Sequence, residues 1–279
     1  MKRLIINLAP TGIVPTKAMN PHVPISIPEI VDDVRCCVAL GVSIIHLHAR
    51  DEYGKPSYNK EIYARLIGSI RESCPEVIIC VSLSGRNFGD FEKRSDPLLL
   101  SGDLKPEMAS LTLSSMNFNR TASMNSPEMI MRLVERMAEA DIKPELEIFD
   151  SGMLNYACFL ADRGLIKPPF YFNFILGNIA NAQAKPSQLG LLIAELPENS
   201  YWSGGAVGPE QLAMNAMGIL YGHGVRVGLE DYLWLDKTRK QPATNRRMVE
   251  RIIELAKLLG REAATPEEVR KALRLPSYG

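Results

Sequence analysis

The chain has 279 residues, of which 46% are hydrophobic and 23% charged, enough to bury a large core in one big domain or two small ones. Thirty-two basic residues balance thirty-two acidic ones. No net field therefore recruits nucleic acid or an anionic membrane, and we expect a small-molecule partner. No run of about 18 apolar residues occurs, so a membrane-spanning helix is not expected.

Short runs rich in isoleucine, valine and leucine recur along the chain and predict eight β-strands. In chain order they are residues 3–9, 43–49, 77–84, 108–113, 144–149, 170–176, 200–205 and 225–230. Amphipathic stretches with helical spacing lie between most of them, for example residues 27–41, 59–74, 126–140 and 208–224. Such an alternation over roughly 250 residues predicts an α/β fold, the (β/α)8 TIM barrel.

A doubly wound sheet is the alternative fold. The loop after the first predicted strand, NLAPTGIVPTKAMNPHVP, is rich in proline and lacks the glycine-rich turn of a dinucleotide site. The chain has no linker long or polar enough to divide it, so residues 1–279 are expected to form one barrel domain. A short extra helix is expected at about residues 265–275, with Thr265 as N-cap and Pro266 in its first turn.

Two histidines, His46 and His48, lie two positions apart in the second predicted strand. Side chains at i and i+2 share a face of a strand, and in a barrel enzyme the site lies where strands end. Two hydrogen-bonded core histidines are the alternative, but two imidazoles side by side in a dry layer are costly to satisfy. We therefore predict that this pair binds a metal ion.

A third metal ligand must be a carboxylate, because the other two histidines, His22 and His223, are expected on the surface. Glu230 ends the last predicted strand on the face that carries Arg226, and the neighbouring Asp231 falls on the rim. Two histidines and one carboxylate leave open positions on Zn²⁺ for a substrate carbonyl, and Fe²⁺ or Mn²⁺ suit the same ligands. The alternative for the two acidic residues is a solvated helix cap.

Further polar residues repeat the two-residue spacing near strand ends, which is unusual for buried strands: Ser82, Ser84, Ser110, Thr112 and Ser114. They indicate a bound ligand, although Ser and Thr also satisfy backbone groups. Ser82, Ser110 and Thr112 are accordingly candidate substrate contacts.

Glu145 and Glu147 share one face of the fifth predicted strand. An inward glutamate is expensive unless it meets a cation or a hydrogen-bond network, and Arg226 is a plausible partner. The five cysteines are scattered without metal-type or redox-type spacing, and the amino-terminal apolar run is too short for a signal peptide. Reduced thiols and a cytoplasmic location are therefore expected.

Seven segments in consistent order resemble the β-keto acid cleavage enzyme family from about residue 5 to 275: HLHARD, SLSGR, MASLT…SMNF, PELEIFD, FNFILGN, RVGLEDYL and LGREAATPEEVRKALRL. The resemblance implies a (β/α)8 barrel, a Zn²⁺ ion and usually a homotetramer. It also implies a reaction in which a β-keto acid and acetyl-CoA give acetoacetate and the CoA ester of the remaining acyl group.

The resemblance also implies roles for individual residues. His46, His48 and Glu230 would bind zinc, and the keto acid would contact Ser82, Gly85 and Ser110. Asp231 would remove a proton from C2 of the keto acid, supported by Arg226 and by a glutamate of PELEIFD, Glu147. No protein nucleophile is required, in keeping with the absence of an activated Cys or Ser motif from the sequence.

One position departs from the family pattern. The member that acts on an amine-bearing keto acid has a carboxylate in the loop after the first strand, whereas this chain has Ile13 and Val14 there and no acid before Glu29. We therefore expect Val14 to face an uncharged acyl group. The basic residues Arg86, Lys93, Arg94 and Arg120 lie near the expected rim, where they either meet CoA phosphates or remain solvated.

Three rival functions fit less well. A metal-dependent hydrolase of the amidohydrolase type needs its histidine pair on the first strand and further histidines on the fifth and sixth, where this chain has PELEIFD and FYFNFIL. Aldolase-type metal-dependent lyases place their histidine pair late in the barrel. A non-catalytic acyl-CoA binder would show CoA affinity without turnover and no effect of replacing Asp231.

Overall fold

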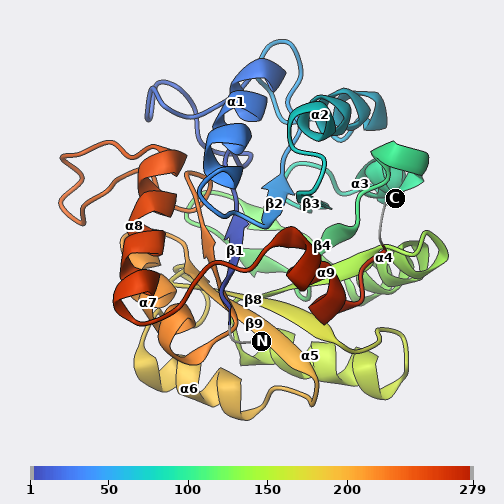
Figure 1. Ribbon diagram of the computed structural model, residues 1–279. Helices are drawn as coiled ribbons and strands as arrows, with labels where there is room; N and C mark the ends of the chain where they lie inside the picture. The colour runs from blue at the N-terminus through green and yellow to red at the C-terminus, as the bar shows by residue number, and fades with distance from the viewer. Residues whose placement is uncertain (1–2, 277–279) are drawn as a thin grey trace.

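Eight parallel strands close into a barrel in the computed structural model, which describes residues 3–276 (Figure 1). The strands are β1 (Ile5–Leu8), β2 (Ile44–Leu47), β3 (Ile78–Val81), β4 (Met108–Thr112), β7 (Lys143–Ile148), β8 (Phe170–Leu176), β9 (Ser200–Ala206) and β10 (Gly224–Val227). Their order around the barrel, β1-β10-β9-β8-β7-β4-β3-β2, pairs the last strand with the first. The predicted single-domain (β/α)8 barrel is confirmed.

The helices form the outer layer (Figure 1). They are α1 (Ile27–Val38), α2 (Lys60–Ser73), α3 (Phe91–Ser95), α4 (Pro127–Glu139), α5 (Ser151–Asp162), α6 (Pro186–Ala194), α7 (Gln211–Tyr221), α8 (Asn245–Leu258) and α9 (Pro266–Leu273). Asn59, Ser126 and Thr265 cap α2, α4 and α9 by accepting backbone N–H groups of the first turn. Within residues 3–276, no helix combines the length and the hydrophobicity that crossing a bilayer requires.

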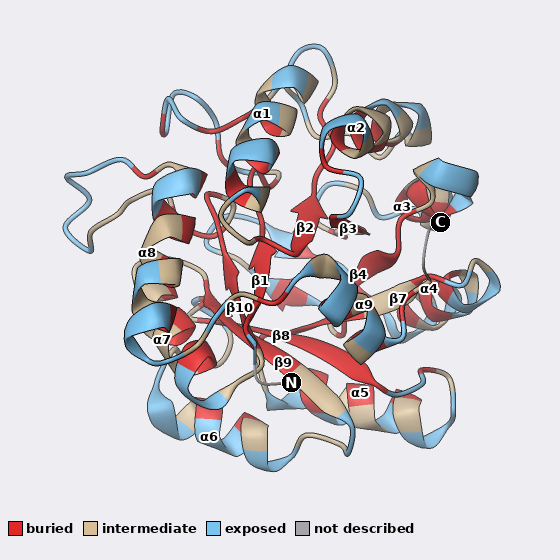
Figure 2. Ribbon diagram, in the orientation of Figure 1, coloured by how far each residue is buried: buried red, intermediate tan, exposed pale blue. Residues whose placement is uncertain are grey.

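Two packed cores hold the barrel together. The larger lies between the strands and the helices, and Figure 2 shows the strands buried throughout most of their length. The smaller lies inside the barrel, where Ile5, Ile44 and Ile78 pack with Val269 and Leu273 of α9. Burying one aliphatic side chain contributes roughly 1.5–3 kcal/mol. Helix α9 therefore closes the end at which the strands begin, and the site must lie at the other end.

Several elements differ from the sequence-based expectations. A two-stranded hairpin, β5 (Met116–Asn117) and β6 (Ala122–Ser123), follows β4, and two short 3-10 helices, η1 (Asp96–Leu99) and η2 (Gly102–Leu104), follow α3. Strand β3 ends at Val81, so Ser82 lies in the following loop. His223 is half-buried rather than on the surface, because its Nδ1 accepts the Trp202 backbone N–H (3.2 Å) beside the start of β10.

Asn245, the first residue of α8, forms hydrogen bonds with the loop after β1 and the loop after β10. Its side-chain amide donates to the Pro10 carbonyl (2.9 Å) and to Asp33 Oδ2 (2.5 Å), and its Oδ1 accepts the Leu229 N–H (2.9 Å). Burial raises the pKa of Asp33 to about 6, against the opposing effect of the Asn245 hydrogen bond. The charged form of Asp33 is therefore disfavoured in the folded protein.

This arrangement predicts a pH-dependent stability difference. Because the folded-state pKa is raised, the contribution of Asp33 to stability is complete below about pH 4 and is lost as the pH rises through about 6. Asp33→Asn should raise the free energy of unfolding by about 1–3 kcal/mol at pH 8 and by much less at pH 4. Urea titrations of both proteins at the two pH values measure this difference. An equal change at both values would contradict the assignment.

Candidate active site

A cavity of about 930 Å³ opens at the carboxyl ends of the strands. Side chains at the end of each of the eight barrel strands, or in the loop after it, line the wall. Ile13, Val14 and Met19 contribute from the loop after β1, and Leu233 and Trp234 from the loop after β10. One side of the mouth is therefore apolar.

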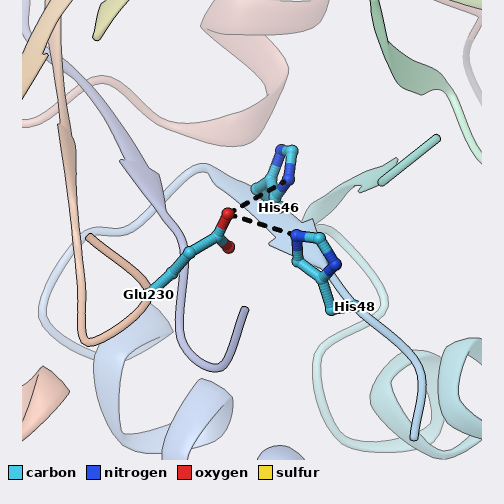
Figure 3. Close-up of side chains that lie close together, drawn as sticks. All are labelled: His46, His48 and Glu230. Carbon is cyan, nitrogen blue, oxygen red and sulfur yellow. Dashed lines mark hydrogen bonds and ion pairs between the residues drawn. The ribbon is translucent and has the colours of Figure 1, made fainter. Parts of the chain in front are cut away.

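The predicted metal ligands meet in this cavity. His46 is on β2, His48 follows its last residue, and Glu230 lies after β10 (Figure 3). Glu230 Oε1 is 3.1 Å from His48 Nε2 and 3.9 Å from His46 Nε2. One ligand atom from each residue lies within 4.8 Å of the others. Ligands of one tetrahedral ion at about 2.1 Å lie roughly 3.4 Å apart, so the three side chains need only small shifts to share an ion.

Glu145 orients His46 and was missed as a site residue from the sequence. It is fully buried, and its Oε2 is 2.6 Å from His46 Nδ1, while Asn7 (2.5 Å) and Asn173 (2.7 Å) donate to Oε1. Because Nδ1 faces Glu145, Nε2 is the His46 nitrogen that faces Glu230. Burial alone would raise the pKa of Glu145, but His46 and Arg226 hold that pKa at about 2.

Arg226, on β10, is buried among carboxylates. Its Nε donates to Asp231 Oδ2 (2.9 Å), its Nη2 donates to Glu230 Oε1 (2.9 Å), and its Nη1 lies 3.5 Å from Glu147 Oε1. Thr112 donates its hydroxyl to Glu147 Oε2 (2.6 Å). The sequence-predicted partners Arg226, Asp231 and Glu147 are thus in one connected network beside the histidines.

Asp231 is buried against Arg226 instead of standing on the rim. The regular alternation of β10 stops at Gly228, whose φ of +150° and close approach to Ala9 leave no room for a side chain: a Cβ there would lie 2.1 Å from the Ala9 carbonyl oxygen. The chain then turns Glu230 and Asp231 together toward Arg226. Strand alternation, which separated the two acids, does not extend through this turn.

Burial shapes the protonation of the site. Burial lowers the pKa of His48, so its neutral imidazole can offer a lone pair. Burial likewise raises the pKa of Asp231, with Arg226 opposing and Glu230 adding to the increase. Burial alone would raise the pKa of Glu230, but His48, Arg226 and His46 hold that pKa well below the usual range. A neutral histidine and a charged carboxylate are the forms that metal ligands require.

The predicted substrate contacts divide into two groups. Ser82, Thr112 and Val14 line the cavity. Ser110 instead accepts the Leu83 backbone N–H on its hydroxyl (3.2 Å), and the Gly85 carbonyl accepts the Met124 N–H (3.3 Å) just after the hairpin. These two residues shape the loop after β3.

Gly12 and Arg50, neither of which the sequence predicted as a site residue, hold the loop after β1 in place. Gly12 has φ +67°, and a Cβ there would lie 2.6 Å from Glu230 Cγ. Arg50 donates through Nη2 to the carbonyls of Gly12 (2.7 Å) and Pro15 (2.8 Å). The GIVP segment therefore packs directly on a predicted metal ligand and carries Val14 to the cavity mouth.

Loops at the carboxyl ends of all eight strands, gathered around one cavity with a histidine and carboxylate cluster inside it, define the chain as a TIM-barrel enzyme. A family model for the β-keto acid cleavage enzyme matches residues 3–275. The chain belongs to that family, as its sequence motifs predicted.

Relatives cover nearly the whole chain. The 3-keto-5-aminohexanoate cleavage enzyme of Acetoanaerobium sticklandii is 38% identical over 275 residues, 98% of each chain. The 3-oxoadipate:acetyl-CoA acetyltransferase of Cupriavidus necator is 33% identical, covering 98% of this chain and 95% of the relative. Among solved structures, apo ObcA is similar in fold, with a TM-score of 0.79 at 20% identity over 91% of this chain and 66% of ObcA.

Proposed function

We propose that the protein is a zinc-dependent β-keto acid cleavage enzyme that converts a β-keto acid and acetyl-CoA into acetoacetate and a new acyl-CoA. The observation that carries this proposal is that two groups of residues line the same cavity. They are the cluster of His46, His48 and Glu230, and the ion pair of Arg226 with Asp231. The names of the relatives, several of which are acetyl-CoA transferases, support acetyl-CoA as co-substrate.

The chain fits a divalent ion at the cluster. Glu230 Oε2 is buried and has no hydrogen-bond partner among residues 3–276, so a lone pair is left for another ligand. Zn²⁺ is the ion we propose, and Fe²⁺ or Mn²⁺ accept the same donors. When bound, such an ion supplies Lewis-acid polarisation of the ketone oxygen of the keto acid.

The residues around the cluster would carry the proton. Asp231 is proposed to take the proton from C2 of the keto acid and to return it at the end of the cycle. Arg226 holds the Asp231 carboxylate through Nε, and Glu147, fixed by Thr112, balances the far side of the guanidinium. Ser82 faces the same cavity and is proposed to contact the keto acid.

The proposed reaction balances without a protein nucleophile. The deprotonated C2 carbon attacks the thioester carbonyl of acetyl-CoA, a new carbon–carbon bond forms, and CoA thiolate leaves. The thiolate then attacks the original ketone, the bond between that carbonyl and C2 breaks, and acetoacetate departs after reprotonation at C2. The acyl group of the original ketone remains on CoA.

Acetoacetate formation by zinc-loaded protein tests the proposal. The assay uses acetyl-CoA with aliphatic, amino-bearing and carboxylate-bearing β-keto acids, and the expected result is product that requires both substrates. Product from none of the acids, with one zinc ion bound per chain, would contradict the reaction and favour another metal-dependent chemistry.

The acyl portion of the preferred substrate is proposed to be uncharged. The acids among the described residues lining the cavity, Glu147, Glu230 and Asp231, all pair with Arg226. Glu29, the first acidic residue of the sequence, pairs with Lys17 (2.7 Å). A substrate ammonium would thus lose hydration at the mouth without gaining a counter-charge.

We therefore expect kcat/KM for an aliphatic β-keto acid to exceed that for an amino-substituted acid of equal length by at least about tenfold, a difference of 1.4 kcal/mol. Val14→Glu should reduce or reverse this preference. Steady-state kinetics with the two acids measure the ratio. Similar turnover of both by the natural protein would contradict an apolar acyl subsite.

Assembly and location are also proposals. A homotetramer is supported by large side chains exposed on neighbouring helices: Phe159 of α5, Leu191 of α6, and Leu220 and Tyr221 of α7. Patches of this kind commonly mark contacts between proteins. A cytoplasmic location is supported by five free cysteines, since disulfides are rare in that compartment.

A further inference from the structure

Two arginines flank the β5–β6 hairpin at the cavity mouth, and their environments differ. Arg94 is buried and donates to the carbonyls of Leu83 (2.9 Å) and Met124 (3.0 Å) and to Asn125 Oδ1 (2.7 Å). Its donors join the loop after β3 to the hairpin. Arg94 therefore has a structural role that accounts for its burial.

Arg86, eight residues earlier in the chain, has no such partners. Its guanidinium lies over the Phe118 ring, with Cζ 3.4 Å from the ring centroid, and Arg86 lines the cavity. Nε is buried without a hydrogen-bond partner, and no side chain in residues 3–276 forms an ion pair with Arg86. A half-buried guanidinium with unused donors is costly unless a ligand satisfies them.

The described carboxylates that line the cavity pair with Arg226 and not with Arg86. Arg226 is already surrounded by carboxylates, so its charge is balanced by the protein. Burial lowers the pKa of Arg86, while the negative charges of Glu230, Glu147 and Asp231 act in the opposite direction. Arg86 thus lies within electrostatic range of the proposed reaction centre but bonds to none of its carboxylates.

We propose that Arg86 binds the carboxylate of the β-keto acid, an assignment that rests on the function proposed above. The planar guanidinium can bond both carboxylate oxygens, and its contact with the Phe118 ring restricts its movement. CoA phosphates carry the same oxyanion chemistry, but the exposed Arg120 and Arg239, which line the outer mouth, are better placed for a bulky diphosphate. Arg86 comes from the wall that also presents Ser82 and Ser84.

Two comparisons test the assignment. The first is between the affinities for acetoacetate and for its neutral analogue methyl acetoacetate, and the second is between the KM values for the keto acid and for acetyl-CoA. In Arg86→Met we expect the KM for the keto acid to rise about 10- to 100-fold, in line with a lost charge-assisted pair, and the KM for acetyl-CoA to change less than about twofold. Calorimetry with zinc-loaded protein should show that Arg86→Met loses affinity for acetoacetate but not for the ester. Arg86→Lys should recover part of the affinity for the acid.

Arg94→Lys is the matched control. It should lower the melting temperature by weakening the loop, yet retain the preference for acid over ester. A rise in the KM for acetyl-CoA in Arg86→Met, with the KM for the keto acid unchanged, would overturn the assignment in favour of phosphate binding. Equal losses for acid and ester would overturn it in favour of a purely structural role. Inactivity of the natural protein would overturn the proposed function and this assignment together.

Discussion

Asp231→Asn is expected to lower kcat by roughly 10²–10⁴-fold, the usual contribution of a general base. Asparagine can keep the hydrogen bond from Arg226 Nε through its amide oxygen, but it cannot take a proton from C2. Affinity for zinc and for acetyl-CoA should change little. The most direct readout is exchange of the C2 hydrogen of the keto acid for solvent deuterium, followed by NMR without acetyl-CoA.

Asp33→Asn is the matched control for this substitution, because it makes the same chemical change at a half-buried carboxylate that does not line the cavity. Its turnover and C2 exchange should equal those of the natural protein. Retention of C2 exchange in Asp231→Asn would show that another group removes the proton. Glu147 would then be the next candidate, since it lines the same cavity.

Glu145→Gln is expected to weaken zinc binding about 10- to 100-fold, the usual effect of losing a partner that orients a ligating histidine. Both oxygens of Glu145 act as acceptors, Oε1 for Asn7 and Asn173 and Oε2 for His46. The side-chain NH2 group of a glutamine would face one of these donors, so that hydrogen bond could not form. Competition with a chromophoric chelator measures the affinity without relying on turnover.

Glu107→Gln provides the comparison for Glu145→Gln. Glu107 is equally buried, but it pairs with Arg270 (2.7 Å) and accepts the Ile79 N–H (3.0 Å) away from the cluster. Its replacement should lower stability and leave zinc affinity unchanged. Unaltered zinc affinity in a folded Glu145→Gln protein would contradict the role given to Glu145.

The architecture and the histidine pair could be predicted from local sequence because both follow short-range rules. Eight alternations of strand and helix indicate the barrel, and the two-residue spacing of His46 and His48 places both side chains on one face. Glu230 could be added because barrel closure brings the last strand beside the first. These features follow from periodic patterns and strand order, so they can be predicted without knowledge of individual contacts.

Other parts of the site depend on contacts that no local pattern encodes. Glu145 is 2.6 Å from His46, 99 residues away on a strand that is not its neighbour, and 3.9 Å from the expected partner Arg226. Barrel closure brings these three side chains together. The inward turn of Asp231 depends on the backbone conformation of Gly228 and its approach to Ala9. The contrast between Arg86 and Arg94 likewise appears only once the hairpin is in place.

Transfer of the acetyl group of acetyl-CoA into acetoacetate is the central claim, and carbon labelling tests it most directly. Zinc-loaded protein is mixed with an aliphatic β-keto acid and acetyl-CoA carrying ¹³C in both acetyl carbons, and the products are followed by NMR. We expect label at C3 and C4 of acetoacetate and an unlabelled acyl group on CoA. Label that stays on CoA or appears as free acetate would contradict it.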